Sequence, residues 1–352
     1  MPRPPRTQGL RPEETLMFSE AAQSSEAVAR QIEHNTALVR GLAADLRARP
    51  PRFIVTSARG SSDHAATFAK YVFETQLGVV TASAAPSVNS LYGSTQDLSD
   101  VLFIAISQSG RSPDLLRQAE AARAAGARVL TLVNTADSPL AALADTVIEL
   151  RAGPERSVAA TKSYICSLAA ILLLAAHWKE DARLLDALQT LPGKLTEAWA
   201  MDWSELVDSL ADARNLFVLA RGLGLGVAQE AALKLKETCG LHAEAFSGAE
   251  VMHGPMTLVD DGFPIVCFTQ DDETRPGLVG LTEEFSARGA RVLLATSGAV
   301  GAGMLPVPSI GHPACTPLLE IQSFYRAVNA LALRRGRNPD APPSLRKVTQ
   351  TV

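Results

Sequence analysis

The sequence has few cysteines and no stretch that is uniformly basic. Its four cysteines include no CxxC pair, so we expect buried, reduced thiols rather than a disulfide framework or a zinc site. There is no run of Lys or Arg, and the formal net charge is −4. This balance argues against a protein that binds along a nucleic-acid backbone.

Segments that would lead to or through a membrane are also missing. The longest apolar stretch, residues 165–178, has the length of a core helix and is too short to span a bilayer. Residues 1–14 contain prolines and charges but no apolar core of a signal peptide, so we expect a loose, flexible arm there. We therefore expect a cytoplasmic protein that binds neither membrane nor nucleic acid.

The composition is that of a folded protein with more than one domain. Apolar residues make up 47% and charged residues 20% of the 352 residues, which suits a globular protein with a sizeable core. Single hydrophobic cores stop growing at roughly 250–300 residues. Two domains are therefore expected.

Strand-like and helix-like segments alternate along the chain. Apolar strand patterns occur at residues 52–57, 101–106 and 128–134, and a helical pattern at 63–76 follows the first of them. Several of these strands are apolar throughout. That pattern predicts an α/β fold with a parallel sheet covered by helices on both faces.

The order of these segments recurs later in the chain. Residues 215–224 (NLFVLARGLG) resemble 52–61, and residues 289–297 (GARVLLATS) resemble 126–134, at nearly the same separation. Two such matches predict a duplicated α/β domain. We place the junction in the helical region 179–212, at the break that Leu191, Pro192 and Gly193 predict. The predicted parts are an arm (1–14), helices with a first domain (15–190), a second domain (191–336) and a C-terminal tail (337–352).

Two serine-rich turns are the strongest signal for a binding site. SQSGRS (107–112) stands between an apolar strand and a helix, and Ser61 and Ser62 follow the neighbouring strand. Backbone N–H groups at a helix N-terminus and uncharged hydroxyls attract an anion, so the turns predict a phosphate site. The alternative is that the serines only cap helices and shape turns. At the corresponding places the second copy has residues 222–224 (GLG) and 270–273 (QDDE), whose carboxylates would repel a phosphate, so we expect one phosphate site.

The second half supplies titratable groups. Glu230, Lys234 and Glu237 recur at i, i+4 and i+7, so they share one helical face. An exposed stripe of ion pairs is one interpretation; a partly buried carboxylate that acts as acid or base is the other. His253 lies in a predicted loop and, like His242 and Glu244, could be structural or solvated.

The motifs together resemble a known family. SQSGRSPD (107–114), SVAATKSY (157–164), EAALKLKET (230–238), LHAEAFSGAEVMHGP (241–255) and PPSLRKVTQTV (342–352) occur in order with their spacings kept. They are similar to the isomerase half of glucosamine-6-phosphate synthase, which consists of two sugar-isomerase (SIS) domains. The resemblance runs from about residue 15 to the C-terminus and implies two tandem flavodoxin-like SIS domains.

The resemblance also implies roles for individual residues. The phosphate of a hexose 6-phosphate would be bound by Ser61, Ser62, Ser107, Gln108, Ser109 and Ser112. Val158 and Ala159 would offer backbone contacts to the sugar. The catalytic residues would be Glu237 for proton transfer, Lys234 and Lys347 for stabilising charge, and His253 for ring opening, the last contributed across a homodimer interface. No metal or cofactor is implied.

One departure from the full synthase bears on the reaction. That enzyme has an N-terminal glutaminase domain with a cysteine at its mature N-terminus, whereas this chain has Pro2 and no cysteine before Cys166. We therefore expect a glucosamine-6-phosphate deaminase that forms fructose 6-phosphate and ammonia and does not use glutamine by that route. The alternatives are an ammonia-dependent synthase, a fructosamine-6-phosphate deglycase, a plain aldose–ketose isomerase and a sugar-phosphate sensor without turnover.

Overall fold

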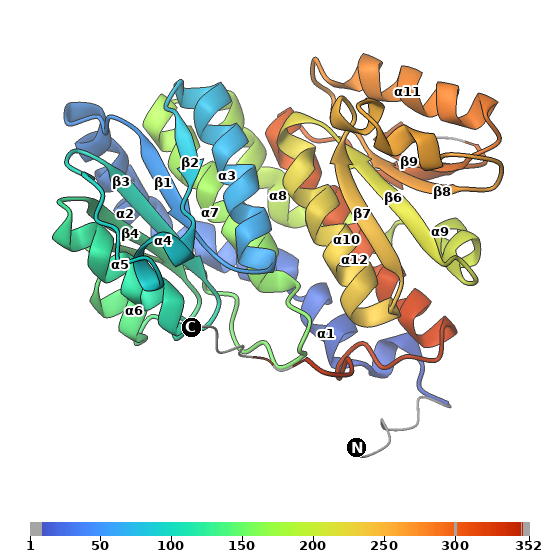
Figure 1. The fold of residues 1–352 in the computed structure, drawn as a ribbon, viewed down its shortest axis with the longest axis horizontal. Helices are drawn as coiled ribbons and strands as arrows, with labels where there is room; N and C mark the ends of the chain where they lie inside the picture. The colour runs from blue at the N-terminus through green and yellow to red at the C-terminus, as the bar shows by residue number, and fades with distance from the viewer. Residues whose placement is uncertain (1–8, 299–300, 346, 348–352) are drawn as a thin grey trace. The chain divides into compact units, whose positions relative to one another are not determined.

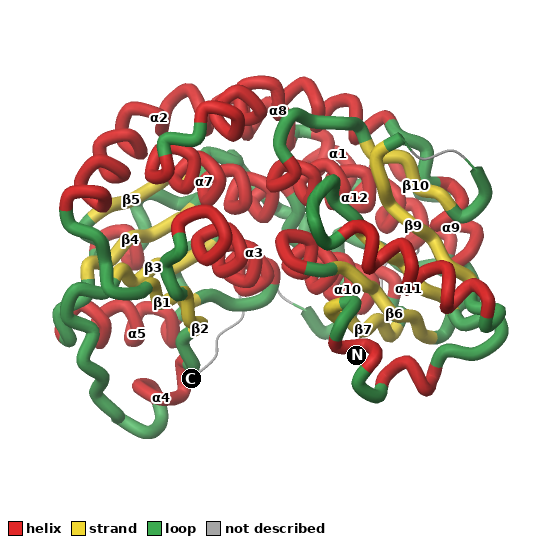
Figure 2. Tube along the Cα trace, turned by 90° about the horizontal axis from the view of Figure 1, so that it is seen from above, coloured by secondary structure: helices red, strands yellow, loops and turns green. Residues whose placement is uncertain are grey.

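The chain forms two compact units, each built on its own five-stranded parallel sheet. The structure is a computed structural model that describes residues 9–298, 301–345 and 347. The first-sheet unit comprises Glu26–Pro154 and Ser163–Gln189; the second-sheet unit comprises the described residues up to Ser25 together with Glu155–Lys162 and Thr190–Lys347. Two parallel sheets, each flanked by helices, confirm the predicted fold class (Figures 1 and 2).

The first sheet has the strand order β2-β1-β3-β4-β5. Every residue of β1 and β3 is buried, as the uniformly apolar patterns predict. Because β2 and β3 lie on opposite sides of β1, right-handed crossovers place α3 and α5 on opposite faces of the sheet. The strands are β1 (Ile54–Ser57), β2 (Thr81–Ser83), β3 (Leu102–Ser107), β4 (Arg128–Val133) and β5 (Thr146–Glu149). The helices around them are α2 (Ser24–Ala48), α3 (Ser61–Leu77), α4 (Pro86–Ser90), α5 (Pro113–Ala124), α6 (Pro139–Ala142) and α7 (Lys162–Lys179).

The second sheet repeats this topology. Its order is β10-β9-β8-β6-β7, so each strand has the same neighbours as its counterpart in the first sheet, which confirms the duplication. The strands are β6 (Asn215–Ala220), β7 (His242–Ser247), β8 (Pro264–Phe268), β9 (Arg291–Ser297) and β10 (Met304–Val307).

Helices cover both faces of the second sheet as well. One face packs against α11, where Phe217, Ile265 and Phe285 belong to a buried apolar cluster. α10 packs against β6, β7 and α12. The helices are α1 (Leu16–Ala22), α8 (Ala182–Ala200), α9 (Ser204–Leu210), α10 (Leu225–Cys239), α11 (Arg275–Ala287) and α12 (Thr316–Arg334), with short 3-10 turns η1 (Pro12–Glu14), η2 (Gly222–Gly224), η3 (Glu250–Met252), η4 (Pro255–Leu258) and η5 (Pro313–Cys315).

The helix break predicted at Pro192 is wrong. α8 continues through Pro192 without interruption. A proline inside a helix removes one backbone N–H and crowds the preceding turn. Here Leu191 and Leu195 are fully buried, and the carbonyl oxygen of Pro192 accepts a hydrogen bond from Ser25 Oγ at 2.6 Å. Tertiary packing therefore outweighs the local preference.

The cysteines are buried in the folded chain. All four are free and buried, as predicted, and burial raises the pKa of Cys239 to about 11. In the part of the chain that the structure describes, no helix is both long enough and apolar enough to cross a membrane.

Candidate active site

The serine turns follow two neighbouring strands of the first sheet. β1 pairs in parallel with β3, so the turn that leads into α3 and the turn that leads into α5 lie at the same edge of the sheet. In doubly wound sheets, ligands bind at the carboxyl ends of the strands where successive connections diverge to opposite faces. β1 and β3 form that point here, because β2 lies on the far side of β1.

Two of the serines also shape the turn after β3. Ser107 Oγ accepts a hydrogen bond from the N–H of Gly110 at 3.0 Å, and Ser109 Oγ accepts one from Arg111 at 3.3 Å. Ser112 is the N-cap residue of α5, yet its side chain makes no capping hydrogen bond. Turn shaping therefore explains part of the role of Ser107 and Ser109. It does not explain Ser112, whose hydroxyl does not cap the helix.

Gly110 is required by the geometry of this turn. Its φ of 63° is in the left-handed region, and a Cβ atom placed on it would lie 2.1 Å from Ser138 Oγ. Glycine adopts this conformation without steric cost, whereas other residues do not. The turn after β3 can therefore keep its shape only with glycine at position 110.

An ion pair that sequence patterns did not predict joins the two turns. Arg59, in the turn after β1, donates from Nε to Asp114 Oδ2 at 2.7 Å. Asp114 is buried in the first turn of α5, while half of the Arg59 side chain is exposed. The only hint in the sequence was the recurrence of Ala58-Arg59-Gly60 in the second copy. The pair fixes the two serine turns relative to each other.

The corresponding edge of the second sheet is closed by a side chain. Gln270 is fully buried and donates from Nε2 to the carbonyl oxygen of Arg221 at 2.8 Å. A Cβ atom on Gly224 would lie 2.8 Å from Gln270 Oε1, so the amide occupies the space at the start of α10. Asp271 is bonded to Arg275 and Ser297. The expectation of a single phosphate site stays a prediction.

α10 carries a buried cluster of charges at the predicted spacing. Lys234 Nζ lies 3.3 Å from Glu230 Oε1 and 2.6 Å from Glu237 Oε2. The side chains of Glu230 and Lys234 are 0% and 1% exposed, whereas that of Glu237 is 21% exposed. The charged stripe on α10 is therefore not solvated. Of its three side chains, that of Glu237 is the one that a ligand can reach.

The two carboxylates keep Lys234 charged. Burial alone would lower the pKa of Lys234, but the opposing charges of Glu230 and Glu237 outweigh it and hold this pKa above its ordinary value. A fourth side chain, Tyr325 of α12, is also fully buried, and its hydroxyl donates to Glu230 Oε1 at 3.0 Å. Tyr325 was not predicted as a site residue.

The segment that contains Val158 and Ala159 is bound by carboxylates at both ends. Glu20 of α1 accepts from the backbone N–H groups of Arg156 and Ser157 at 2.5 and 3.1 Å. Glu155 accepts from the N–H of Thr161 at 3.0 Å. These contacts hold residues 155–162 in the second-sheet unit although they lie between β5 and α7 in the sequence.

The C-terminal tail completes this arrangement. Lys347 Nζ lies 3.3 Å from Glu155 Oε2 and donates to the carbonyl oxygen of Ser157 at 2.7 Å. The Asp340 carboxylate accepts from the N–H groups of Leu16 and Met17 at 2.8 and 2.7 Å. The remainder of the predicted tail motif, Arg346 and residues 348–352, lies outside the described residues.

His253 is exposed at the end of η3, in the loop that follows β7. Its backbone N–H donates to the carbonyl oxygen of Glu250 at 2.9 Å. Two exposed apolar side chains stand nearby in the sequence, Met252 at 52% and Leu258 at 62% exposure. His242 and Glu244 are exposed on β7.

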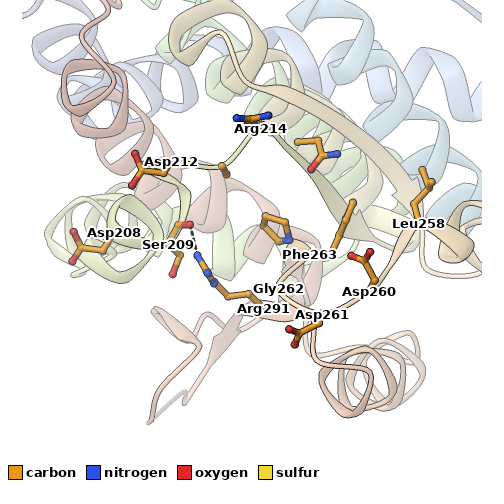
Figure 3. Close-up of a pocket in the computed structure, with 13 residues that line it drawn as sticks. Asp208, Ser209, Asp212, Arg214, Leu258, Asp260, Asp261, Gly262, Phe263 and Arg291 are labelled. Atoms are coloured by element: carbon orange, nitrogen blue, oxygen red, sulfur yellow. Dashed lines mark hydrogen bonds between the residues drawn. The ribbon is translucent and has the colours of Figure 1, made fainter.

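A hollow of about 580 Å³ in the second-sheet unit lies at the other edge of its sheet (Figure 3). It is lined by Asn215, Pro264 and Arg291, which begin β6, β8 and β9. Figure 3 shows Arg291 reaching across to Ser209, whose carbonyl oxygen accepts its hydrogen bond at 2.9 Å. Amino ends of parallel strands are not where such folds bind ligands, so we do not assign the chemistry to this hollow.

No group of three or more His, Cys, Asp or Glu side chains among the described residues is arranged to hold a metal ion. Among the described residues, titratable groups gather on α10, with Tyr325, and around residues 155–162.

Comparisons with known proteins agree with the fold. The isomerizing glutamine–fructose-6-phosphate aminotransferase of Thermococcus kodakarensis is 31% identical over 349 residues, which cover 94% of this chain and 57% of that protein. The chain spans about half the length of the curated relatives it matches.

Solved structures are similar over nearly the whole chain. The crystal structure of a candidate phosphosugar isomerase from Silicibacter pomeroyi DSS-3 is 43% identical, with a TM-score of 0.86, and the match covers 93% of this chain and 100% of that one. The C-terminal domain of glucosamine-fructose-6-phosphate aminotransferase from Francisella tularensis is 25% identical, with a TM-score of 0.83 and coverage of 94% and 98%.

The family model described as SIS domain matches residues 49–177 and 209–299. The first range contains all strands of the first sheet, and the second contains β6 to β9 of the second. Since these ranges make up more than half of the residues, the chain belongs to the SIS domain family.

Proposed function

We propose that the chain converts glucosamine 6-phosphate and water into fructose 6-phosphate and ammonia. The observation that carries the proposal is the α10 cluster, in which Glu237 is a partly exposed carboxylate held by a buried lysine. A base tuned by burial and by neighbouring charges is what proton transfer next to a carbonyl group requires. Similarity to proteins named for phosphosugar isomerase and fructose-6-phosphate aminotransferase activities supports the substrate class.

The serine turns of the first-sheet unit bind the phosphate in this proposal. Ser61, Ser62 and Gln108 contribute with Ser107, Ser109 and Ser112, and uncharged donors suffice because N–H groups at the start of α3 and α5 add partial positive charge. The Ser112 side chain makes no capping hydrogen bond to α5, and this supports its assignment to the phosphate.

Glu237 carries out the proton transfer. His253 first moves a proton between the ring oxygen and the C1 hydroxyl, which opens the ring to the aldehyde. Glu237 then removes the C2 proton, which is acidic because C2 is next to the carbonyl carbon, and returns it to C1 of the resulting enolamine. The product is an imine at C2, and water hydrolyses it to the ketone with release of ammonia.

The other residues bind and orient the sugar. The backbone at Val158 and Ala159 contacts it, in a segment that Glu20 and Glu155 hold in place. Lys347 stabilises negative charge that develops on the substrate oxygens, and its contact with Ser157 places it beside that segment. Lys234 is buried and contributes its charge through its contact with Glu237.

We further propose that the protein acts as a homodimer in which His253 serves the site of the partner subunit. The exposure of His253 between the exposed apolar side chains of Met252 and Leu258 supports this, because such side chains favour burial in an interface. Analytical ultracentrifugation of the wild type tests it, and a monomer at micromolar concentration would contradict it.

One assay separates the possible reactions. The purified protein is incubated with glucosamine 6-phosphate, and ammonia and fructose 6-phosphate are measured separately. Equal amounts of both are expected. Formation of glucosamine 6-phosphate from fructose 6-phosphate and ammonium, without the forward reaction, would indicate a synthase. Absence of turnover would reject the proposal in favour of a plain isomerase, a sensor or a deglycase.

A further inference from the structure

Tyr325 is joined to the predicted base through a chain of short contacts. Its hydroxyl bonds to Glu230 Oε1, the same oxygen lies 3.3 Å from Lys234 Nζ, and Nζ lies 2.6 Å from Glu237 Oε2. Three of the four side chains are fully buried. The contacts lie between α10 and α12, which pack against each other in the second-sheet unit.

Burial makes the geometry of these four side chains sensitive to each hydrogen bond. A carboxylate in the interior needs its lone pairs bonded, because the loss of a partner leaves a charge that water cannot solvate. The Tyr325 hydroxyl and Lys234 both bind Oε1 of Glu230. Together they fix where that carboxylate lies.

Lys234 is positioned by the balance between its two carboxylates. Its side chain is 1% exposed, so it acts on Glu237 rather than on a bound sugar. Its contact with Oε2 leaves the transferred proton to the other oxygen of Glu237. A displacement of Glu230 would draw Nζ with it and change the orientation of Glu237.

We propose that Tyr325 is a positioning residue for the proton transfer at Glu237 and acts through Glu230 and Lys234. The inference rests on the proposed function, which assigns the base role to Glu237. It goes beyond the predicted site because Tyr325 lies in a helix that carries none of the predicted site residues. The competing explanation is that Tyr325 is a packing residue whose hydroxyl is merely satisfied.

The test compares two buried hydroxyls of the same helix. Tyr325→Phe keeps the ring and removes the hydrogen bond to Glu230. Ser323→Ala is the matched control, because Ser323 is buried two residues earlier and its hydroxyl bonds to the carbonyl oxygens of Ala198 and Leu319 instead. Turnover and the ¹³C chemical shift of the Glu237 carboxyl carbon are measured in the full-length protein, with the signal assigned by its loss in Glu237→Gln.

The carboxyl signal of Glu237 should respond to a change at Glu230 or Tyr325. In Tyr325→Phe and in Glu230→Gln the contact of Lys234 with Glu237 changes, so the ¹³C signal of Glu237 should move relative to that of the wild type. In Ser323→Ala it should not move. For Tyr325→Phe we also expect kcat to fall roughly tenfold while KM stays within about twofold, since the phosphate contacts are unchanged.

The outcomes separate this inference from the proposed function. A Glu237 signal that moves in Tyr325→Phe but not in Ser323→Ala, in a protein that shows no turnover, would support the positioning role and reject the reaction. A Glu237 signal in Tyr325→Phe equal to that of the wild type would overturn the inference, as would a loss of kcat of the same size in Ser323→Ala.

Discussion

Lys347 donates from Nζ to the backbone carbonyl oxygen of Ser157 at 2.7 Å, a contact between residues 190 positions apart in the sequence. The same ammonium group faces the buried carboxylate of Glu155 at 3.3 Å. The tail lysine is therefore bound to the segment that we assign to sugar contact.

Glu155→Gln should lower turnover roughly tenfold, because the amide removes the charge that faces Lys347. Its oxygen can still accept the hydrogen bond from Thr161, so the fold should persist. The measurement is kcat with glucosamine 6-phosphate, with Glu283→Gln on the exposed face of α11 as control. A kcat within about twofold of the wild type would show that Lys347 does not depend on Glu155.

Glu237→Gln should lower kcat by at least ~10²-fold, the usual scale for a lost general base. Binding of the substrate, measured by calorimetry, should change little because the phosphate contacts remain. Turnover within a factor of about three of the wild type would remove Glu237 from the mechanism.

The double variant Ser107→Ala/Ser109→Ala should raise KM for the phosphorylated sugar, since each lost hydrogen bond to a charged group contributes roughly 1.5–3 kcal/mol. Free glucosamine should be a poor ligand of both proteins. Ser94→Ala, at an exposed serine of the same unit, serves as control. An unchanged KM would place the phosphate elsewhere.

Gly110→Ala should destabilise the protein and weaken phosphate binding, because the new Cβ meets Ser138 and φ is positive. Gly41→Ala is the matched control: Gly41 lies inside α2 and a Cβ there meets nothing within 4 Å. That change should stabilise by about 0.5–1 kcal/mol. Thermal unfolding measures both, and equal effects of the two substitutions would contradict the assigned role of Gly110.

Glu320 should make the free energy of unfolding depend on pH. It is fully buried in α12. Burial raises its pKa well above the ordinary value of 4.5. The folded state therefore holds this proton more tightly than the unfolded chain does, so stability falls as the pH rises above 4.5 until the folded pKa is passed.

Glu320→Gln should remove that dependence. Between pH 5 and pH 8, the melting temperature of the wild type should fall relative to that of the variant. Glu283→Gln should retain the pH dependence of the wild type. Parallel curves for wild type and Glu320→Gln would show that the carboxyl group is solvated in the folded protein.

Much of the fold could be predicted from local pattern. The buried strands β1, β3, β4, β6 and β9 coincide with apolar runs, because strands covered on both faces need apolar residues at every position. β2, β5, β7, β8 and β10 were not predicted. All of them except β8 lie at the edges of their sheets, where one side needs no partner strand, and β2, β5 and β10 have only three or four residues. Short edge strands leave little periodicity to detect.

The site could be predicted only where its signal is local. The spacing of Glu230, Lys234 and Glu237 follows from the helical repeat, and their contacts in α10 confirm that they share a face. Tyr325 and Glu20 could not be found in this way. Tyr325 meets Glu230 across 95 positions and Glu20 meets Arg156 across 136, and such contacts arise from packing rather than from neighbouring residues.

The binding of Asp340 to the N–H groups of Leu16 and Met17 has a consequence for synthesis on the ribosome. These contacts span 324 and 323 positions. The N–H groups at the start of α1 therefore cannot bind the Asp340 carboxylate until residue 340 has been translated. The residues of the first-sheet unit up to Gln189 are all made before then. That unit can fold before residue 340 has been made, whereas the contacts of Asp340 with α1 in the other unit form only afterwards.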